Sequence, residues 1–185
     1  MKKFAIILIL LGSVFMFSAF KTPETYEIEA QKNANIHNNK GIMYMKDYWW
    51  YAAIQEFKIA ISLNPETQAS AVYYNNLGEC YMKIGYPDLA QDCFERAVKL
   101  YSLNFQYFLN LAECYEALGI TDKKLAHTYE NDVPLNYIMR GLLLEKQGNL
   151  TDAITVLDEF TAKEPDLLIT PAVKDYIKTL VQKVY

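Results

Sequence analysis

The sequence predicts an all-α protein, a solenoid of about four helix hairpins with a C-terminal capping helix, preceded by an N-terminal apolar helix. Two observations support this class. Apolar residues recur three, four and seven positions apart, which is the spacing of residues on one helix face. One pattern of small and aromatic residues also returns about every 34 residues. A single hairpin cannot bury its apolar face alone, so repeated hairpins are expected to stack.

The bulk composition narrows the class of protein. The chain has 185 residues, room for one domain with an appendage, and its net charge of −4 argues against nucleic acid, which requires a basic stripe. Three cysteines, an odd number, exclude a complete disulfide framework. Cys80 and Cys114 occupy equivalent places in successive hairpins, and we expect them, like Cys93, to be small buried packing residues.

The N-terminus has the pattern of an export signal or a membrane anchor. Lys2 and Lys3 precede an apolar run at 4–20, and Lys21 ends it. The run is close to the minimum of about 17 residues for a spanning helix, and no good cleavage site follows, so cleavage and anchoring both stay open. The positive-inside rule leaves the two lysines in the cytoplasm and places the rest of the chain across the membrane. We therefore expect an exported protein, either anchored by its N-terminus or periplasmic or secreted after cleavage, with residues 21–33 as a spacer.

The clearest hairpin lies at 73–100. Gly85 is suited to ending a first helix, and Pro87 is suited to starting a second one. Small residues allow the two helix backbones to approach closely, and aromatic residues fill the gaps around them. The residues that set this pattern are Tyr74, Leu77, Gly78 and Tyr81 on the first helix and Ala90, Phe94 and Ala97 on the second.

Three further copies of the pattern surround this hairpin. They are His37-x-x-Lys40-Gly41-x-x-Tyr44 with Ala53 and Phe57, Phe108-x-x-Leu111-Ala112-x-x-Tyr115, and Tyr137-x-x-Arg140-Gly141-x-x-Leu144 with Ala153, Leu157 and Phe160. The chain resembles the tetratricopeptide repeat (TPR) family over residues 34–167. The resemblance implies a right-handed α-solenoid, with repeats at 34–67, 71–104, 105–133 and 134–167. It also implies that the first helices line a concave groove that binds other proteins.

The repeats depart from the family spacing in two places. Gly41 and Gly78 are 37 residues apart, which predicts a longer loop at 66–70. Ala112 and Gly141 are only 29 apart, so we expect the third repeat to be degenerate, with a shortened second helix capped by Thr121. In the first repeat Tyr48 stands at the usual glycine. Of the two tryptophans that follow it, Trp50 is predicted to enter the core and Trp49 to be exposed.

Residues 168–185 are predicted to form the capping helix, starting at Thr170 and Pro171. Apolar residues follow one face of it, as expected of a helix that covers the open end of a repeat array. A dimerisation helix is the alternative. The residues of that face are Val173, Tyr176, Ile177, Leu180, Val181 and Val184.

No pattern in the sequence indicates catalysis. The two histidines, His37 and His127, are far apart in the repeats, and the chain has no phosphate-binding loop, nucleophile elbow or His-Glu-x-x-His motif. There is no C-x-x-C pair or His/Cys cluster either. We therefore expect no enzyme activity, no cofactor and no metal.

Binding residues are better indicated. The asparagines Asn39, Asn76 and Asn110 share one repeat position, and their amides suit the backbone of an extended peptide. Contact with the neighbouring repeat, or simple solvation, is the alternative. Glu79 and Glu113 form a second, acidic row. The family's carboxylate clamp for chaperone tails is not expected, because its basic positions are not matched.

The first helix of the fourth repeat is apolar nearly all round. Either the capping helix and the third repeat bury all of it, or Leu135, Ile138, Met139 and Leu142 leave an apolar pocket at one end of the groove.

The function expected from these patterns is a non-enzymatic interaction module, exported or membrane-anchored, that binds a peptide segment of another protein in its concave groove. The partner is not identified. The alternative is a structural or self-assembling subunit of an envelope complex, possible as a homo-oligomer, that docks through the capping helix.

Overall fold

The computed structural model describes residues 29–184, and all of the regular structure in them is helical. The predicted N-terminal signal or anchor lies outside the described residues. Within 29–184, none of the helices combines the length and the hydropathy that crossing a bilayer requires. The helices are α2 (Ala30–Lys46), α3 (Trp50–Leu63), α4 (Ser70–Lys83), α5 (Pro87–Leu100), α6 (Phe105–Ala117), α7 (Thr121–His127), α8 (Pro134–Lys146), α9 (Leu150–Lys163) and α10 (Thr170–Val184).

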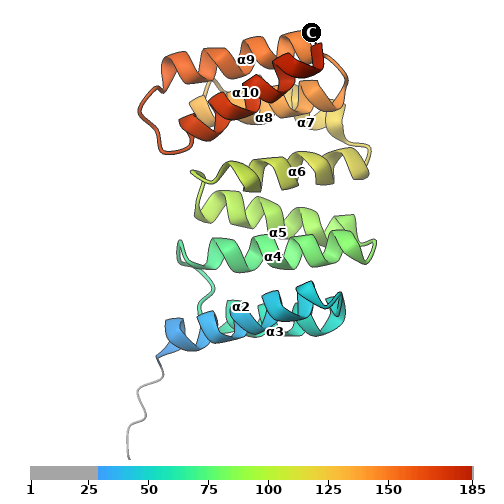
Figure 1. The fold of residues 1–185 in the computed structure, drawn as a ribbon, viewed down its shortest axis with the longest axis vertical. Helices are drawn as coiled ribbons and strands as arrows, with labels where there is room; N and C mark the ends of the chain where they lie inside the picture. The colour runs from blue at the N-terminus through green and yellow to red at the C-terminus, as the bar shows by residue number, and fades with distance from the viewer. Residues whose placement is uncertain (1–28, 185) are drawn as a thin grey trace, which may run out of the picture.

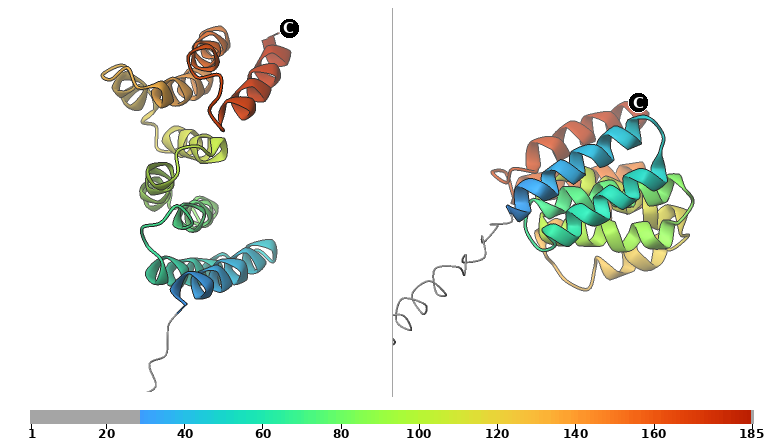
Figure 2. Two further views of the ribbon diagram at one scale, coloured as in Figure 1. Left: turned by 90° about the vertical axis from the view of Figure 1, so that its left-hand side faces the viewer. Right: turned by 90° about the horizontal axis from the view of Figure 1, so that it is seen from below.

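The helices form four stacked hairpins in chain order, α2/α3, α4/α5, α6/α7 and α8/α9, with α10 at the far end of the stack (Figure 1). The stack is curved. In Figure 2 the first hairpin and α10 extend on one side beyond α4 and α6, while α5 and α7 lie on the other side. The first helices of the middle repeats therefore lie on the concave side of the stack, as predicted for a solenoid.

Each regular hairpin is closed by a glycine on its first helix that faces a large side chain on its second. A Cβ atom added to Gly78 would lie 2.6 Å from Cε1 of Phe94, a distance that real packing does not allow. Gly41 faces Phe57 in the same way at 2.5 Å, and Gly141 faces Leu157 at 2.5 Å. Small residues at these positions thus let the backbones approach, as the sequence predicts.

The turns inside the hairpins need a left-handed backbone. Three of them place a glycine there, Gly85, Gly119 and Gly148, with φ between 67° and 81°. The first repeat has Tyr48 at that place, with φ of 61°, a conformation that costs a non-glycine residue about 1–2 kcal/mol. As predicted, the neighbouring Trp49 is 62% exposed, and Trp50 packs partly buried against the core.

The predicted irregularities appear in the connections. Residues 64–69 join the first two hairpins, whereas 101–104 join the second and third. Helix α7 has 7 residues, against 14 in each of α3, α5 and α9, so the predicted shortening is confirmed. The predicted cap is wrong: Ile120 takes the N-cap position and Thr121 is the first helical residue, with no side-chain cap. Helix α2 begins at Ala30, within the predicted spacer.

Helix α10 closes the end of the stack. Val173, Ile177 and Leu180 are buried in the main core. The ring of Tyr176 meets that of Phe105 edge-on at 5.2 Å between centroids. The apolar face that the sequence assigned to capping or dimerisation is thus turned mainly towards the chain's own core.

The three cysteines are packing residues, as expected. All are buried and free. Burial raises the pKa of Cys80 and of Cys93 to about 12, and that of Cys114 to about 11. The thiols are therefore neutral at physiological pH and poor nucleophiles.

Candidate peptide-binding groove

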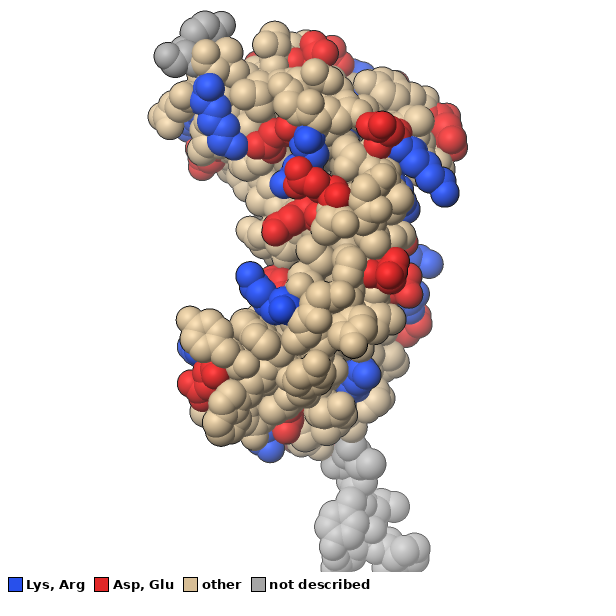
Figure 3. Space-filling view, turned by 90° about the vertical axis from the view of Figure 1, so that its right-hand side faces the viewer, with Lys and Arg blue, Asp and Glu red and all other residues tan. Residues whose placement is uncertain are grey.

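The concave face is hollowed between the first three repeats, and acidic and basic side chains gather in the hollow (Figure 3). A cavity of about 390 Å³ lies there between α2, α3, α4 and α6, with Phe94 of α5 behind it. Its lining combines apolar, amide and charged side chains, namely Met45, Trp50, Glu79, Met82, Lys83, Phe94, Gln106, Asn110 and Glu113.

The apolar part of this groove comes from equivalent residues of successive repeats. Met45 and Met82 each lie four residues after the small residue of their repeat, on the first helix. The next two repeats have Glu116 and Glu145 at the same position. Methionine side chains are flexible and adapt to irregular partners. This repeat position therefore carries a flexible apolar side chain in the first two repeats and a carboxylate in the last two.

The two acidic residues of the second half are engaged by the chain itself. Glu116 pairs with Lys146 at 2.8 Å between carboxylate and Nζ, and Glu145 pairs with Lys183 of α10 at 2.8 Å. By contrast, Glu113 and Lys83 are exposed in the cavity, and neither has an ion-pair partner among the described residues. The free charge of the groove therefore lies beside the methionines.

The predicted asparagine row joins neighbouring repeats. Nδ2 of Asn76 donates to Oδ1 of Asn38 at 3.0 Å. Nδ2 of Asn110 donates to Oδ1 of Asn75 at 2.8 Å and to Oε1 of Glu79 at 3.0 Å. In the absence of a partner, the amides of Asn76 and Asn110 therefore contact the neighbouring repeat, which was the alternative to peptide binding.

The asparagines keep some capacity for a ligand. Asn76 and Asn110 are only half-buried, and Asn39 is exposed on the first repeat. The hydrogen bonds accepted by Asn38 and Asn75 were not predicted, although the doublets Asn38-Asn39 and Asn75-Asn76 are visible in the sequence.

Two predicted groove residues are not on the groove surface. Ile138 is 0% exposed and Leu142 is 1% exposed, and both belong to the main core together with Val173 and Ile177 of α10. Leu135 and Met139, which were predicted with them, line a cavity between α5, α6, α7 and α8, whereas Ile138 and Leu142 do not form the predicted apolar pocket. The alternative given above, that the chain's own packing covers this helix, describes them.

The sequence analysis also missed the two methionines. Met45 and Met82 share one position in successive repeats, and that coincidence was available in the sequence. Their exposure to the groove depends on the curvature of the stack, which the sequence does not give.

Among residues 29–184, no group of three His, Cys, Asp or Glu side chains is arranged to hold a metal ion. The two histidines each face one carboxylate. Nδ1 of His37 lies 2.6 Å from Oε2 of Glu56, and Nδ1 of His127 lies 2.8 Å from Oε2 of Glu130.

Comparisons with known proteins agree with this architecture. Models of the tetratricopeptide repeat match residues 71–104, the predicted second repeat, and residues 137–166, within the predicted fourth. No curated protein sequence matches the chain.

Solved structures resemble the fold. Two crystal structures of MamA align with TM-scores of 0.51 and 0.50, each at 22% identity over 72% of this chain and over 79% and 74% of theirs. A third, YrrB, described as a TPR protein with an unusual peptide-binding site, aligns with a TM-score of 0.48 at 21% identity, over 77% of this chain and 74% of its own. The family models thus identify tetratricopeptide repeats at 71–104 and 137–166, and the stacked hairpins of the described residues have the architecture of that family.

Proposed function

We propose that this chain is a non-enzymatic interaction scaffold that holds a segment of another protein in the groove between its first three repeats. The observation that carries the proposal is the juxtaposition of Met45 and Met82 with Glu113 and Lys83, two charges without ion-pair partners among the described residues. The two methionines are only partly buried against the core, and a folded chain with no partner gains little from leaving apolar surface beside unpaired charges on a concave face.

The groove suits a segment with an apolar anchor and charged neighbours. The methionines would cover the anchor, Glu113 would face a basic side chain and Lys83 an acidic one. The amides of Gln106 and Asn110 could hydrogen-bond the partner's backbone. The proposal includes export or anchoring by the N-terminus, which rests on the sequence of residues 1–21 alone. N-terminal sequencing of the protein from membrane and soluble fractions would test that part.

Docking through α10, the alternative function, has less support. Three apolar residues of that helix are buried in the chain's own core, and only Val181 and Val184, 37% and 39% exposed, are left at its end. Sedimentation of the purified protein over a range of concentrations separates the two functions, because self-assembly would raise the sedimentation coefficient with concentration.

Reversing charges in the groove, and in separate variants at exposed positions outside it, tests whether the groove binds a partner protein. Glu113→Lys and Lys83→Glu change exposed groove residues, whereas Asp92→Lys and Lys123→Glu make the same changes at exposed positions of α5 and α7. Tagged variants are expressed in the source cells, and the co-purifying proteins are quantified by mass spectrometry.

We expect at least one protein to be captured about tenfold less by the groove variants and equally by the control variants. Circular dichroism checks that all four variants fold. An unchanged set of captured proteins in the groove variants would rule out the groove as the binding site.

A further inference from the structure

The third repeat lacks half of its second helix. Helix α7 has 7 residues where the other second helices have 14. At 1.5 Å of rise per residue, about 10 Å of helix is absent from this side of the array. The other hairpins use that length to cover the apolar face of their first helix.

The shortened end is fixed in place by the fourth repeat. Nη2 of the buried Arg140 donates to the backbone oxygen of Thr128 at 2.6 Å, and its guanidinium lies between the rings of Tyr129, at 4.0 Å, and Tyr137, at 4.8 Å. Nδ2 of Asn136 also donates to the backbone oxygen of Asn131 at 3.0 Å. The gap beyond α7 is thus bounded by ordered contacts.

The large side chain that closes the other hairpins is also missing here. Thr128 stands sixteen residues after Ala112, the position that Phe57, Phe94 and Leu157 take in their own repeats. Oγ1 of Thr128 donates to the backbone oxygen of Leu125 at 2.7 Å, so this side chain is held against its own helix.

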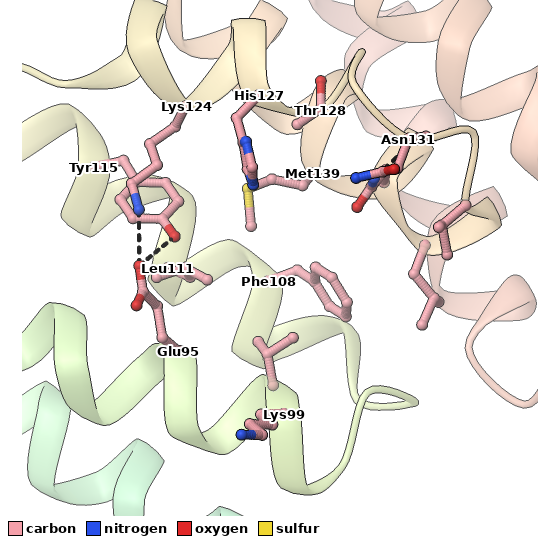
Figure 4. Close-up of a pocket in the computed structure, with 14 residues that line it drawn as sticks. Glu95, Lys99, Phe108, Leu111, Tyr115, Lys124, His127, Thr128, Asn131 and Met139 are labelled. Atoms are coloured by element: carbon pink, nitrogen blue, oxygen red, sulfur yellow. Dashed lines mark hydrogen bonds and ion pairs between the residues drawn. The ribbon is translucent and has the colours of Figure 1, made fainter.

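A cavity of about 590 Å³ lies between α5, α6, α7 and α8 at this gap. Figure 4 shows Phe108 and Leu111 of α6 between Lys99 of α5 and His127 of α7, with Met139 of α8 beside them. Apolar side chains from three helices and the loop after α7 contribute to the lining, which includes Val98, Phe108, Leu111, Val133, Leu135 and Met139.

The rim of this cavity carries one unpaired positive charge, although the chain as a whole is acidic. Lys124 is neutralised by Glu95, with 2.9 Å between Nζ and Oε1. Lys99 is exposed, lines the cavity and has no ion-pair partner among the described residues. A ligand with a carboxylate near Lys99 would complement this charge.

We propose that the cavity binds a short amphipathic helix of a partner protein, which completes the third hairpin from outside. The helix would insert a Phe or Leu side chain over Phe108 and Leu111, in the space that Thr128 leaves, and would place an acidic residue beside Lys99. A helix is favoured because a second helix occupies the equivalent place in the other three repeats. This cavity is separate from the concave groove, because the two have no lining residue in common.

The chain supplies its own probe. A synthetic peptide of residues 87–100 copies α5, a complete second helix with Phe94 and the acidic residues Asp92 and Glu95. Its affinity for the full-length protein in mild detergent is measured by fluorescence anisotropy. We expect saturable binding that falls at least tenfold when the Phe94 position of the peptide is alanine.

Two protein variants locate the site. Thr128→Phe fills the cavity, and Lys99→Glu reverses its rim charge; each should weaken the peptide at least tenfold. Lys83→Glu, the same charge change in the groove, should leave the affinity unchanged. If Thr128→Phe does not fold, judged by circular dichroism, the two lysine variants still decide the matter.

Three results would overturn the proposal: no binding of the peptide, equal affinities for all variants, or a loss with Lys83→Glu alone, which would place the peptide in the groove. Concentration-dependent dimerisation abolished by Lys99→Glu, with no peptide binding, would assign the cavity to a second copy and would also overturn it. The groove proposal is decided by a different measurement, the capture of partner proteins by the groove variants, so the two proposals fail separately.

Discussion

One pair of positions per repeat sets how closely each hairpin packs. The small residue of the first helix and the residue sixteen positions later face each other, and their sizes are matched. Glycine stands opposite phenylalanine or leucine in three repeats, and Ala112 goes with Thr128 in the third. Their sizes are matched because the interior is close-packed. A larger side chain at one position of the pair therefore requires a smaller one at the other.

Enlarging the small member should be costly. Gly78→Leu would drive a side chain into Phe94 and is expected to destabilise the protein by about 1–3 kcal/mol or more. Asn76→Ala removes one hydrogen bond on the same helix and should cost only about 1 kcal/mol. Urea unfolding of both variants measures the difference, and a larger loss for Asn76→Ala would mean that the assigned helix faces are wrong.

The surroundings of Glu95 shift its pKa, and this shift makes the stability of the protein depend on pH. Burial tends to raise its pKa, but hydrogen bonds from Lys124, Gln91 and Tyr115 outweigh burial and hold the pKa below its usual value of 4.5. A carboxylate with a depressed folded-state pKa stabilises the protein above the unfolded-state pKa and loses that contribution as the pH falls through the folded-state value.

The stability difference between the wild type and Glu95→Gln should therefore be constant above about pH 4.5 and should shrink towards zero in stronger acid. Urea unfolding from neutral pH down to about pH 3 measures it. Glu159→Gln, at an exposed position without an ion-pair partner in the described part of the chain, is the control and should show little pH dependence. A difference that grows in acid would contradict the assigned shift.

At the scale of elements, α7 shows how a degenerate repeat is tolerated. It has no buried residue of its own, and its C-terminal end depends on the guanidinium of Arg140 in the next repeat. A cation also stabilises the carbonyl end of a helix through the helix dipole. The shortened helix is thus held by α8, across the boundary between repeats.

Replacing that cation should loosen this segment alone. In Arg140→Met we expect amide hydrogen exchange to accelerate over residues 121–133, while the first two repeats keep their protection. Arg96→Met removes a half-buried guanidinium that pairs with Glu66 and serves as the control, with exchange over 121–133 unchanged. Equal protection of residues 121–133 in Arg140→Met and the wild type would exclude this role.

At the scale of the whole molecule, the array is a curved stack whose far end is closed by its own last helix. Because each hairpin contacts only its neighbours, an open end would expose the apolar face of the fourth repeat. Leu180 of α10 is 0% exposed and belongs to the same core as Ile138 and Leu142. The cap therefore stabilises the end of the array through the core that it shares with α8 and α9.

A charge in the cap should open that end. Leu180→Asp places an unpaired carboxylate in the core and is expected to cost about 3 kcal/mol or more, with loss of protection in α8 and α9. Thr179→Asp puts the same charge on the exposed side of α10 and should change stability by less than about 0.5 kcal/mol. Thermal unfolding compares the two, and similar losses would show that α10 does not cap the array.

Local features of the fold could be predicted from the sequence, because they depend on nearby residues. Gly85 and Pro87 mark a turn and a helix start through their own backbone preferences, and the spacing of Gly78 and Phe94 gives the hairpin. The short distance from Ala112 to Gly141 likewise revealed the shortened helix.

Contacts between repeats could not be predicted in the same way, because they depend on the curvature of the stack. The pairing of Asn76 with Asn38, the burial of Ile138 and the exposure of Met82 each require the offset between neighbouring hairpins. The role of Arg140 could not be predicted either, because its partner is the end of a helix whose length had first to be known.

The central proposal is that the concave face, between stacked hairpins, holds another protein. Site-specific photo-crosslinking in the source cells tests it most directly, with the crosslinker at Met82 in the groove or, as the control, at Asp92 on α5. We predict that position 82 captures one partner protein reproducibly and that position 92 does not. Two results would contradict the proposal. Position 82 could crosslink only to residues 1–28 of the same chain, or a partner protein could be captured from position 92 and not from position 82.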